Sequence, residues 1–147
     1  MRFCVINGPN LNLLGEREPS IYGKITYDGM CRELDQFAKD HSSTVEFVQS
    51  NCEGILIDAI QSARKTADAI IINPGAYTHT SYALHDALRS IQIPAIEVHI
   101  SNISSREDFR KNSLTASACI GQISGLGIFG YKAAMMAFLD QSAKINE

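Results

Sequence analysis

The sequence has no tryptophan, no Cys-x-x-Cys pair, no long run of one charge sign and no long uninterrupted apolar run. A helix needs about 18 consecutive apolar residues to span a bilayer, so we expect no membrane segment. The four cysteines are Cys4, Cys31, Cys52 and Cys119, and they stand far apart in the chain. That spacing argues against a zinc site or a disulfide framework and favours reduced core thiols in a cytoplasmic protein.

The length and composition that are present describe an ordinary folded domain. The chain has 147 residues and no linker, repeat or low-complexity tract, so we predict a single domain over residues 1–147. Hydrophobic residues make up 45% of the chain, and without tryptophan the aliphatic side chains must supply most of the core. A net charge of -3 argues against a nucleic-acid partner, because phosphates favour a basic surface. Residues 1–7 are too short for a signal peptide and instead predict a buried strand.

Short apolar runs alternate with amphipathic stretches along the chain. The apolar runs predict five strands, at residues 3–6, 44–48, 69–72, 95–99 and 118–123. The stretches between and after them predict helices at residues 26–41, 54–66, 80–91 and 128–144. In the first of these helices, the spacing of Met30, Leu34, Phe37 and His41 predicts one buried face.

The alternation of strands and helices indicates an α/β fold whose parallel sheet is covered on both faces. Right-handed crossovers leave few topologies open, and the commonest order for five strands is the flavodoxin-like 2-1-3-4-5. We therefore predict a flavodoxin-like three-layer sandwich. In such folds a ligand binds beyond the carboxyl ends of the strands, near the switch point between the first and third strands.

The loop that follows the first predicted strand is unusually long. It covers residues 7–23, whereas a strand-to-helix connection usually takes about 2–6 residues. The loop carries Arg17 and Tyr22 together with three glycines. Its length is typical of a binding loop or lid, although an ordinary surface loop with turn residues would look similar.

The ends of the third and fourth strands carry further polar residues. Asn73 begins a turn that leads to a helix near Thr80, with Thr78 or Thr80 as its N-cap, and free N–H groups there favour an anion. Glu97 and His99 are two residues apart on one strand, so their side chains share a face. A carboxylate beside an imidazole fixes its tautomer and suits a general acid, but a satisfied buried ion pair has the same pattern.

Two arginines follow the fourth strand. Arg106 and Arg110 are four residues apart on a short predicted helix, where they could grip one carboxylate together. A solvated charged face is the more usual role of such a pair, and Glu107 and Asp108 between the two arginines support that interpretation.

Residues 125–130 read Gly-Leu-Gly-Ile-Phe-Gly, which has the spacing of a dinucleotide-binding loop. Only 17 residues follow Gly130, so no second strand remains to carry the ribose-binding acid of a βαβ unit. We interpret the glycines as close packing of the last helix on the sheet. No Walker A lysine motif is present either.

Four segments together resemble the type II 3-dehydroquinate dehydratases. The matching segments are residues 7–23, 73–81, 97–102 with Arg106 and Arg110, and 121–125. Their order and spacing fit from residue 3 to about residue 139. The resemblance implies a cytoplasmic, metal-free and cofactor-free lyase of the shikimate pathway. Such an enzyme converts the small molecule 3-dehydroquinate to 3-dehydroshikimate through an enolate, and it assembles as a homo-oligomer in which trimers group into a dodecamer.

The resemblance also implies a role for each matching residue. Tyr22 would remove the proton beside the ketone, with Arg17 stabilising its anion. Asn73 would hold a water against the enolate oxygen. His99, oriented by Glu97, would protonate the departing hydroxyl.

Further matching positions are those of substrate-binding residues. They are Asn10, Gly75, His79, Asp86, Ile100, Ser101 and Arg110. Among them, the Ile100 and Ser101 backbone would hold the substrate carboxylate, and Asp86 would reach the site of a neighbouring subunit. The chain departs from the usual residues of the family at Tyr82, His85, Ser104 and Ser105, positions that bear on affinity and assembly rather than on the chemistry.

Two other functions are compatible with the fold. A flavodoxin-like FMN-binding protein would need a Ser/Thr/Gly-rich phosphate loop after the first strand, and this loop has Asn, Pro, Leu and Arg instead. A non-catalytic scaffold of the same family would be expected to lose Arg17, Tyr22 or His99, and all three are present.

Overall fold

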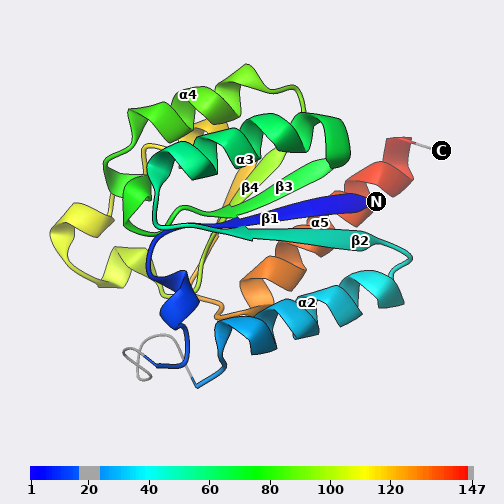
Figure 1. Cartoon of the computed structure of the whole chain (residues 1–147), viewed down its shortest axis with the longest axis horizontal. Helices are drawn as coiled ribbons and strands as arrows, with labels where there is room; N and C mark the ends of the chain where they lie inside the picture. The colour runs from blue at the N-terminus through cyan, green and yellow to red at the C-terminus, as the bar shows by residue number, and fades with distance from the viewer. Residues whose placement is uncertain (17–23, 146–147) are drawn as a thin grey trace.

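The computed structural model describes residues 1–16 and 24–145 of the chain. Its sheet has five parallel strands, which are β1 (Arg2–Asn7), β2 (Thr44–Gln49), β3 (Ala69–Asn73), β4 (Ala95–His99) and β5 (Gly121–Ser124). The strand order is β2-β1-β3-β4-β5, and the helices lie in a layer on each face of the sheet (Figure 1). The predicted flavodoxin-like three-layer sandwich is confirmed.

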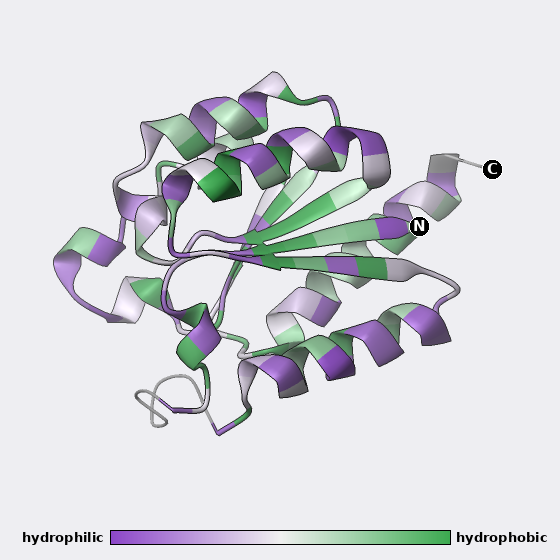
Figure 2. Cartoon of the chain, in the orientation of Figure 1, coloured by the Kyte–Doolittle hydropathy of each residue, from purple (hydrophilic) through white to green (hydrophobic). Residues whose placement is uncertain are grey.

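The two outer layers each contain two long helices. They are α2 (Tyr27–Asp40) and α5 (Phe129–Ile145) on one face, and α3 (Glu53–Thr66) and α4 (Tyr82–Ser90) on the other (Figure 1). Strands β1, β3 and β4 are buried and apolar for most of their length, as strands covered on both faces require (Figure 2). Each face therefore has its own hydrophobic core, with Leu34 and Phe138 in one and Leu56 and Leu84 in the other.

The starts of two helices are fixed by hydroxyl caps. Thr26 accepts a hydrogen bond from the backbone N–H of Gly29 at 3.1 Å, which begins α2. Ser81 does the same for α4, accepting from the Leu84 N–H at 2.9 Å. The predicted caps at Thr78 and Thr80 are wrong, because residues 75–79 form a 3-10 turn and delay the helix.

Two other local predictions need correction. In α2 the buried face contains Met30, Leu34 and Ala38, whereas Phe37 is half-buried and His41 is exposed beyond the end of the helix. The fifth strand begins at Gly121 rather than at residue 118, because residues 116–118 close a 3-10 turn before it.

The glycines of residues 125–130 serve packing and turns. A Cβ atom on Gly130 would lie 3.2 Å from Val98 Cγ1 and 3.4 Å from Ile123 Cγ2, so α5 approaches β4 and β5 closely here. Gly125 has a φ of +85°, which glycine adopts without strain, and its N–H donates to the His99 carbonyl at 3.1 Å. The prediction that this motif serves helix packing is confirmed at Gly130.

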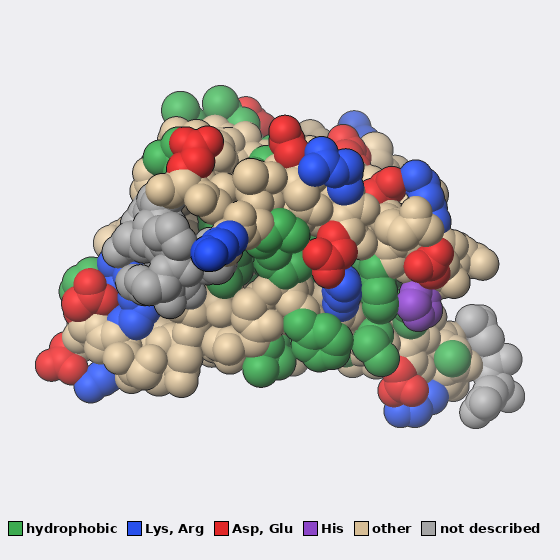
Figure 3. All heavy atoms as spheres, turned by 90° about the horizontal axis from the view of Figure 1, so that it is seen from below, with side chains coloured by type: hydrophobic (Ala, Val, Ile, Leu, Met, Phe, Trp, Pro, Cys, Tyr) green, Lys and Arg blue, Asp and Glu red, His purple; other side chains and the backbone are tan. Residues whose placement is uncertain are grey.

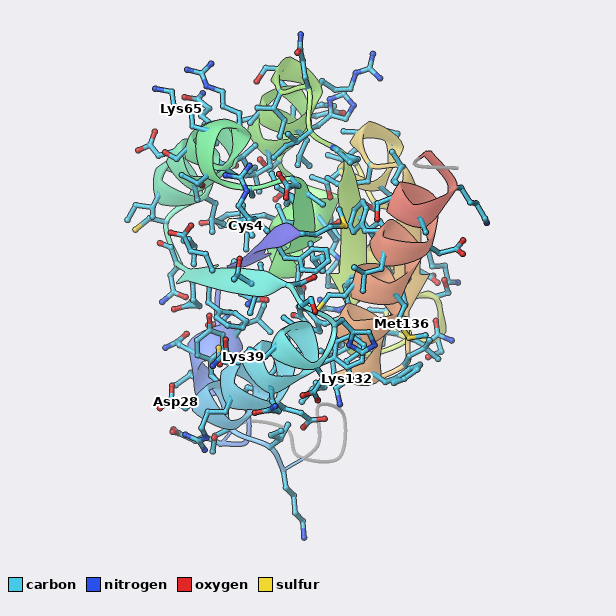
Figure 4. All side chains as sticks on the ribbon, turned by 90° about the vertical axis from the view of Figure 1, so that its right-hand side faces the viewer. Cys4, Asp28, Lys39, Lys65, Lys132 and Met136 are labelled. Carbon is cyan, nitrogen blue, oxygen red and sulfur yellow. The ribbon has the colours of Figure 1, made fainter. Side chains whose placement is uncertain are left out.

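The surface carries charges of both signs. On the face seen in Figure 3, acidic and basic side chains are interspersed around a group of apolar ones. In Figure 4 Cys4 lies inside, at the sheet, while Lys65 extends outward from α3. All four cysteines are free thiols, but Cys52 is exposed, so the prediction of core thiols fails for that residue. Within residues 1–16 and 24–145, no helix has the length and apolar character needed to span a membrane.

Candidate active site

A pocket opens at the carboxyl ends of β1, β3 and β4, where the fold predicts a ligand site. Its lining residues are Pro9, Asn10, Leu11, Leu14, Asn73, Gly75, Ala76, His79, His99, Ile100, Ser101, Ile103, Arg106 and Arg110. Eight of the predicted site residues therefore meet around one cavity, although they lie far apart in the sequence. They are Asn10, Asn73, Gly75, His79, His99, Ile100, Ser101 and Arg110. Glu97 lies behind His99. Arg17 and Tyr22 lie outside the described residues.

The centre of the site is a buried carboxylate–imidazole pair on β4. Glu97 has no exposed surface, and His99 is 5% exposed. The Nε2 atom of His99 donates to Glu97 Oε1 at 2.6 Å. Nδ1 is the other nitrogen of this ring, which lines the pocket, and it has no bond to the residues that the structure describes. Because the two residues alternate along the strand, β4 itself places both side chains on one face. The arrangement fixes the tautomer of the imidazole.

Glu97 is held by a set of side chains that we call the carboxylate cage, formed by Thr78, Ser113, Thr115 and Gln122. Thr78, Ser113 and Gln122 donate to Oε1 at 2.9, 2.8 and 2.9 Å, and Thr115 donates to Oε2. Burying a carboxylate is costly unless its oxygens are hydrogen-bonded, and the cage satisfies both of them.

The cage also explains the ionisation of Glu97. Burial alone would raise the pKa of this carboxyl group, but the hydrogen bonds and charge of His99, with the bonds from Thr115 and Ser113, outweigh it. The pKa of Glu97 is lowered as a result to about 2. The site therefore holds a permanent negative charge behind the imidazole at neutral pH.

Asn73 ends β3 and faces the pocket with a carboxamide that is bonded on both sides. Its Oδ1 accepts from the Gly75 N–H at 3.2 Å, and its Nδ2 donates to the Tyr131 hydroxyl at 2.9 Å. With respect to the described residues, each atom keeps one unused position, a lone pair on Oδ1 and a hydrogen on Nδ2. Asn73 can therefore hold a water or a substrate oxygen without giving up its own support.

The loops after β1 and β3 touch through two glycines. A Cβ atom on Gly8 would lie 2.3 Å from the Pro74 carbonyl oxygen, which no side chain could occupy. Gly75 has a φ of +59°, in the left-handed region, and packs against Pro9. Asn10, the residue after Pro9, also has a positive φ of 69°, and its N–H donates to Asn51 Oδ1 at 2.9 Å. The pocket wall is thus set by backbone contact rather than by side-chain length.

The two arginines reach the pocket, but not from one helix as predicted. Residues 103–105 and 108–110 form two separate 3-10 turns, because the chain is extended at Arg106 and Glu107 between them. Arg106 donates to the Ser101 hydroxyl at 3.3 Å, and Arg110 donates to Glu107 Oε2 at 2.7 Å. Arg106 Nε also lies 3.6 Å from Glu107 Oε2, and both arginines line the same cavity.

Of the predicted substrate-binding residues His79 and Asp86, the first lines the pocket and the second does not. His79 lies in the pocket wall, where its Nδ1 is 2.8 Å from the Asn112 carbonyl and its ring stacks edge-on against Phe109. Asp86 does not line the pocket of its own chain. It lies on α4 with 81% of its side chain exposed, beside His85 at 3.1 Å.

Sequence reasoning missed the carboxylate cage and the support for Asn73. Thr78 and Gln122 stand within segments that were already singled out, but their targets are 19 and 25 residues away. Ser113 and Thr115 lie in a plain connection without any pattern. Tyr131 falls in the helix predicted at residues 128–144, and nothing in the spacing of that helix signals a polar role.

The comparisons with known proteins agree with this geometry. Residues 1–139 match the family described as dehydroquinase class II. A curated 3-dehydroquinate dehydratase from Fusobacterium nucleatum is 52% identical over 143 residues, covering 95% of this chain and 97% of that relative. Another, from Caldicellulosiruptor bescii, is 57% identical over 137 residues, covering 92% and 94%.

Solved structures lead to the same family. The crystal structure of a type II dehydroquinase from Butyrivibrio crossotus has a TM-score of 0.92 at 50% identity, covering 93% of this chain and 96% of that one. A 3-dehydroquinate dehydratase-like protein from Bifidobacterium longum is more distant, with a TM-score of 0.68 at 32% identity, covering 93% of this chain and 94% of that one. On this evidence the chain belongs to the class II dehydroquinase family.

Proposed function

We propose that this protein is a 3-dehydroquinate dehydratase of the shikimate pathway, which eliminates water from 3-dehydroquinate to give 3-dehydroshikimate through an enolate. The observation that carries the proposal is the buried Glu97–His99 pair, which shares one pocket with Asn73. An elimination beside a ketone needs a base, a stabiliser for the enolate oxygen and an acid for the leaving hydroxyl. The pocket offers candidates for the second and third of these.

His99 is the proposed general acid. Hydroxide is a poor leaving group, so the departing oxygen must receive a proton as the carbon–oxygen bond breaks, a contribution of about 10²–10⁴-fold. Glu97 occupies Nε2 and leaves Nδ1 as the nitrogen that can deliver this proton. The carboxylate of Glu97 holds the ring in place through Nε2, so that Nδ1 faces the pocket.

Tyr22 is the proposed base and Arg17 its cationic partner. A tyrosine has an ordinary pKa of about 10, so acting as a base near neutral pH requires a nearby cation. The residues described as lining the pocket include no tyrosine or free carboxylate that could take this role. This part of the proposal rests on the match of residues 7–23 to the family.

Asn73 is the proposed support for the enolate, through the water that its unused lone pair or amide hydrogen can hold. The substrate carboxylate would lie at the backbone of Ile100 and Ser101, with the Ser101 hydroxyl. Asn10, Gly75, His79 and Arg110 line the same cavity and would surround the ring and its hydroxyls. No metal or cofactor enters this scheme, because each proton transfer has its own side chain.

Asp86 is proposed to act on a neighbouring subunit. Its exposed carboxylate on α4 is free to reach beyond its own chain, which suits a trimer-based dodecamer in the cytoplasm. The pocket would then be completed by assembly.

The test is to mix the purified protein with 3-dehydroquinate and follow the ultraviolet absorbance of the conjugated enone, with and without a chelator. We expect turnover that the chelator leaves unchanged. His99→Ala should collapse turnover through kcat, while His41→Ala, which removes an exposed histidine at the end of α2, should not. No enone from the wild-type protein, or a bound flavin in its visible spectrum, would refute the proposal.

A further inference from the structure

Tyr131 occupies a place that the proposed chemistry does not use. It lies in the first turns of α5, is fully buried, and sends its hydroxyl toward the ends of β1 and β3. That hydroxyl accepts from Asn73 Nδ2 at 2.9 Å and donates to Asn7 Oδ1 at 2.7 Å. The three side chains come from α5, β3 and β1, and they form one buried hydrogen-bonded row that ends in the pocket.

The direction of this row is set at its pocket end. The Gly75 N–H can only donate, so the atom of Asn73 that faces it must be the carbonyl oxygen. The amide nitrogen of Asn73 then faces Tyr131, whose oxygen must accept, so its own hydrogen is left for Asn7. One backbone N–H therefore determines the orientation of every group in the row.

At the other end of the row, this orientation leaves the side-chain nitrogen of Asn7 without a hydrogen-bond partner among the described residues. Asn7 presents its oxygen to Tyr131, and among residues 1–16 and 24–145 its Nδ2 has no partner within hydrogen-bond distance, although the Tyr27 hydroxyl lies nearby. Reversing the row would give that nitrogen an acceptor in Tyr131, but it would also set the Asn73 nitrogen against the Gly75 N–H. The fold leaves a buried donor unpaired at Asn7 and keeps the carboxamide of Asn73 in one orientation.

The glycine motif gives Tyr131 its reach. Gly130 lies 3.2 Å, measured from an added Cβ, from Val98 of β4, so α5 sits close to the sheet one residue before the tyrosine. A larger residue would move the helix outward and lengthen the bonds to Asn73 and Asn7. In the proposed function, residues 125–130 bind no dinucleotide phosphate. Their Gly130 instead lets α5 lie close enough to the sheet for Tyr131 to reach Asn73 and Asn7.

We propose that Tyr131 is a positioning residue for the elimination, which holds the Asn73 carboxamide in the single orientation that supports the enolate water. The inference rests on the proposed function. A group that is held by two fixed bonds before substrate arrives needs no reorganisation when charge develops on the substrate oxygen. Losing one of the bonds lets the carboxamide turn, and misplacement of about 1 Å costs on the order of 10²-fold in rate.

The first test is Tyr131→Phe, which keeps the ring and removes the hydroxyl. We expect kcat to fall about tenfold to a hundredfold, with KM changed by less than about threefold, because the Asn73 water acts on the enolate rather than on the bound ketone. The matched control is Ser43→Ala, which removes another buried hydroxyl, bonded to the His41 carbonyl at the opposite end of the sheet. It should lower stability without lowering kcat. An unchanged kcat in Tyr131→Phe would overturn the inference.

A double-mutant cycle separates positioning from a general loss of structure. In an Asn73→Ala background, Tyr131→Phe should have no further effect on kcat, since the group that it positions is gone. An equal fold-loss in both backgrounds would show that Tyr131 acts elsewhere and would overturn the inference. The cycle is run only on a preparation whose wild type produces enone, so failure of the proposed function is seen before it.

A measurement on the wild-type protein needs neither turnover nor a folded variant. The Asn73 side-chain amide proton that faces Tyr131 should exchange with deuterated water far more slowly than the exposed side-chain amide of Asn102. Exchange at equal rates would mean that the bond to Tyr131 does not persist in solution, and the inference would fail.

Discussion

The charge of Glu97 makes a prediction about stability that can be worked out in advance. In the folded protein its pKa lies at about 2, below the ordinary value of 4.5. A carboxyl group whose pKa is lower in the folded state stabilises the fold above its unfolded-state pKa. That contribution is lost as the pH falls through the folded-state value. The window for Glu97 therefore runs from about pH 5 down to about pH 2.

The magnitude follows from the same two values. At about 1.4 kcal/mol for each pKa unit, the difference between 4.5 and about 2 corresponds to about 3 kcal/mol of unfolding free energy at neutral pH. Linkage predicts that about 2 kcal/mol of this is already lost at pH 3. No discount for solvent screening applies, because Glu97 has no exposed surface.

The perturbation is Glu97→Gln, which keeps the shape of the side chain and removes its titration. Urea unfolding of the wild type and the variant, at one protein concentration and at several pH values from 3 to 7, gives the difference between their unfolding free energies. We expect this difference to shrink by about 2 kcal/mol from pH 7 to pH 3. Asp58→Asn, on the exposed side of α3, controls for the loss of one negative charge.

The result that would refute this reasoning is a constant difference. If the two curves run parallel from pH 3 to pH 7, Glu97 has the same proton affinity in the folded and unfolded states. The carboxylate cage and His99 would then not hold it as an anion, and the electrostatic support for His99 would be lost with it.

Three further predictions test the proposed site. Tyr22→Phe should abolish turnover while substrate binding, followed by calorimetry, stays within about threefold, and substantial residual activity would remove Tyr22 from the role of base. Gly8→Ala should destabilise the fold by about 1–3 kcal/mol, because its Cβ would lie 2.3 Å from the Pro74 carbonyl, whereas Gly54→Ala meets no atom within 4 Å and should not. Asp86→Ala and His99→Ala subunits, dissociated and reassembled together, should regain part of the activity that each lacks alone; no recovery would confine Asp86 to its own chain.

Most of the fold was predictable because it depends on local patterns. The buried face of α3 and the bounds of β4 follow from the spacing of apolar residues, and the structure agrees with both. Errors occurred where the chain follows turn geometry instead of periodicity. Residues 75–79 and 116–118 form 3-10 turns that shorten the neighbouring helix and strand, and neither has a sequence pattern that separates it from them.

The sequence predicted those contacts of the site that form between residues close together in the chain, but not those between distant residues. Glu97 and His99 stand two residues apart, so their contact follows from the geometry of one strand. The bond between Asn73 and Tyr131 joins residues 58 positions apart, and it exists only because Gly130 lets α5 approach the sheet. A local sequence pattern gives no information about a contact between residues so far apart in the chain.

The two polar networks of the site, one around Glu97 behind His99 and one around Asn73, are built by opposite means. Glu97 is held by four donors from three other segments, and it stays charged beside His99. Asn73 stays neutral and is held between one donor and one acceptor, so its value lies in direction rather than in charge. A general acid needs a partner that stabilises its charged form, whereas an oxyanion support needs a dipole that is already aimed. The two networks share no residue among these bonds, so the loss of one should lower the rate without weakening the other, and combined changes across them should multiply rather than saturate.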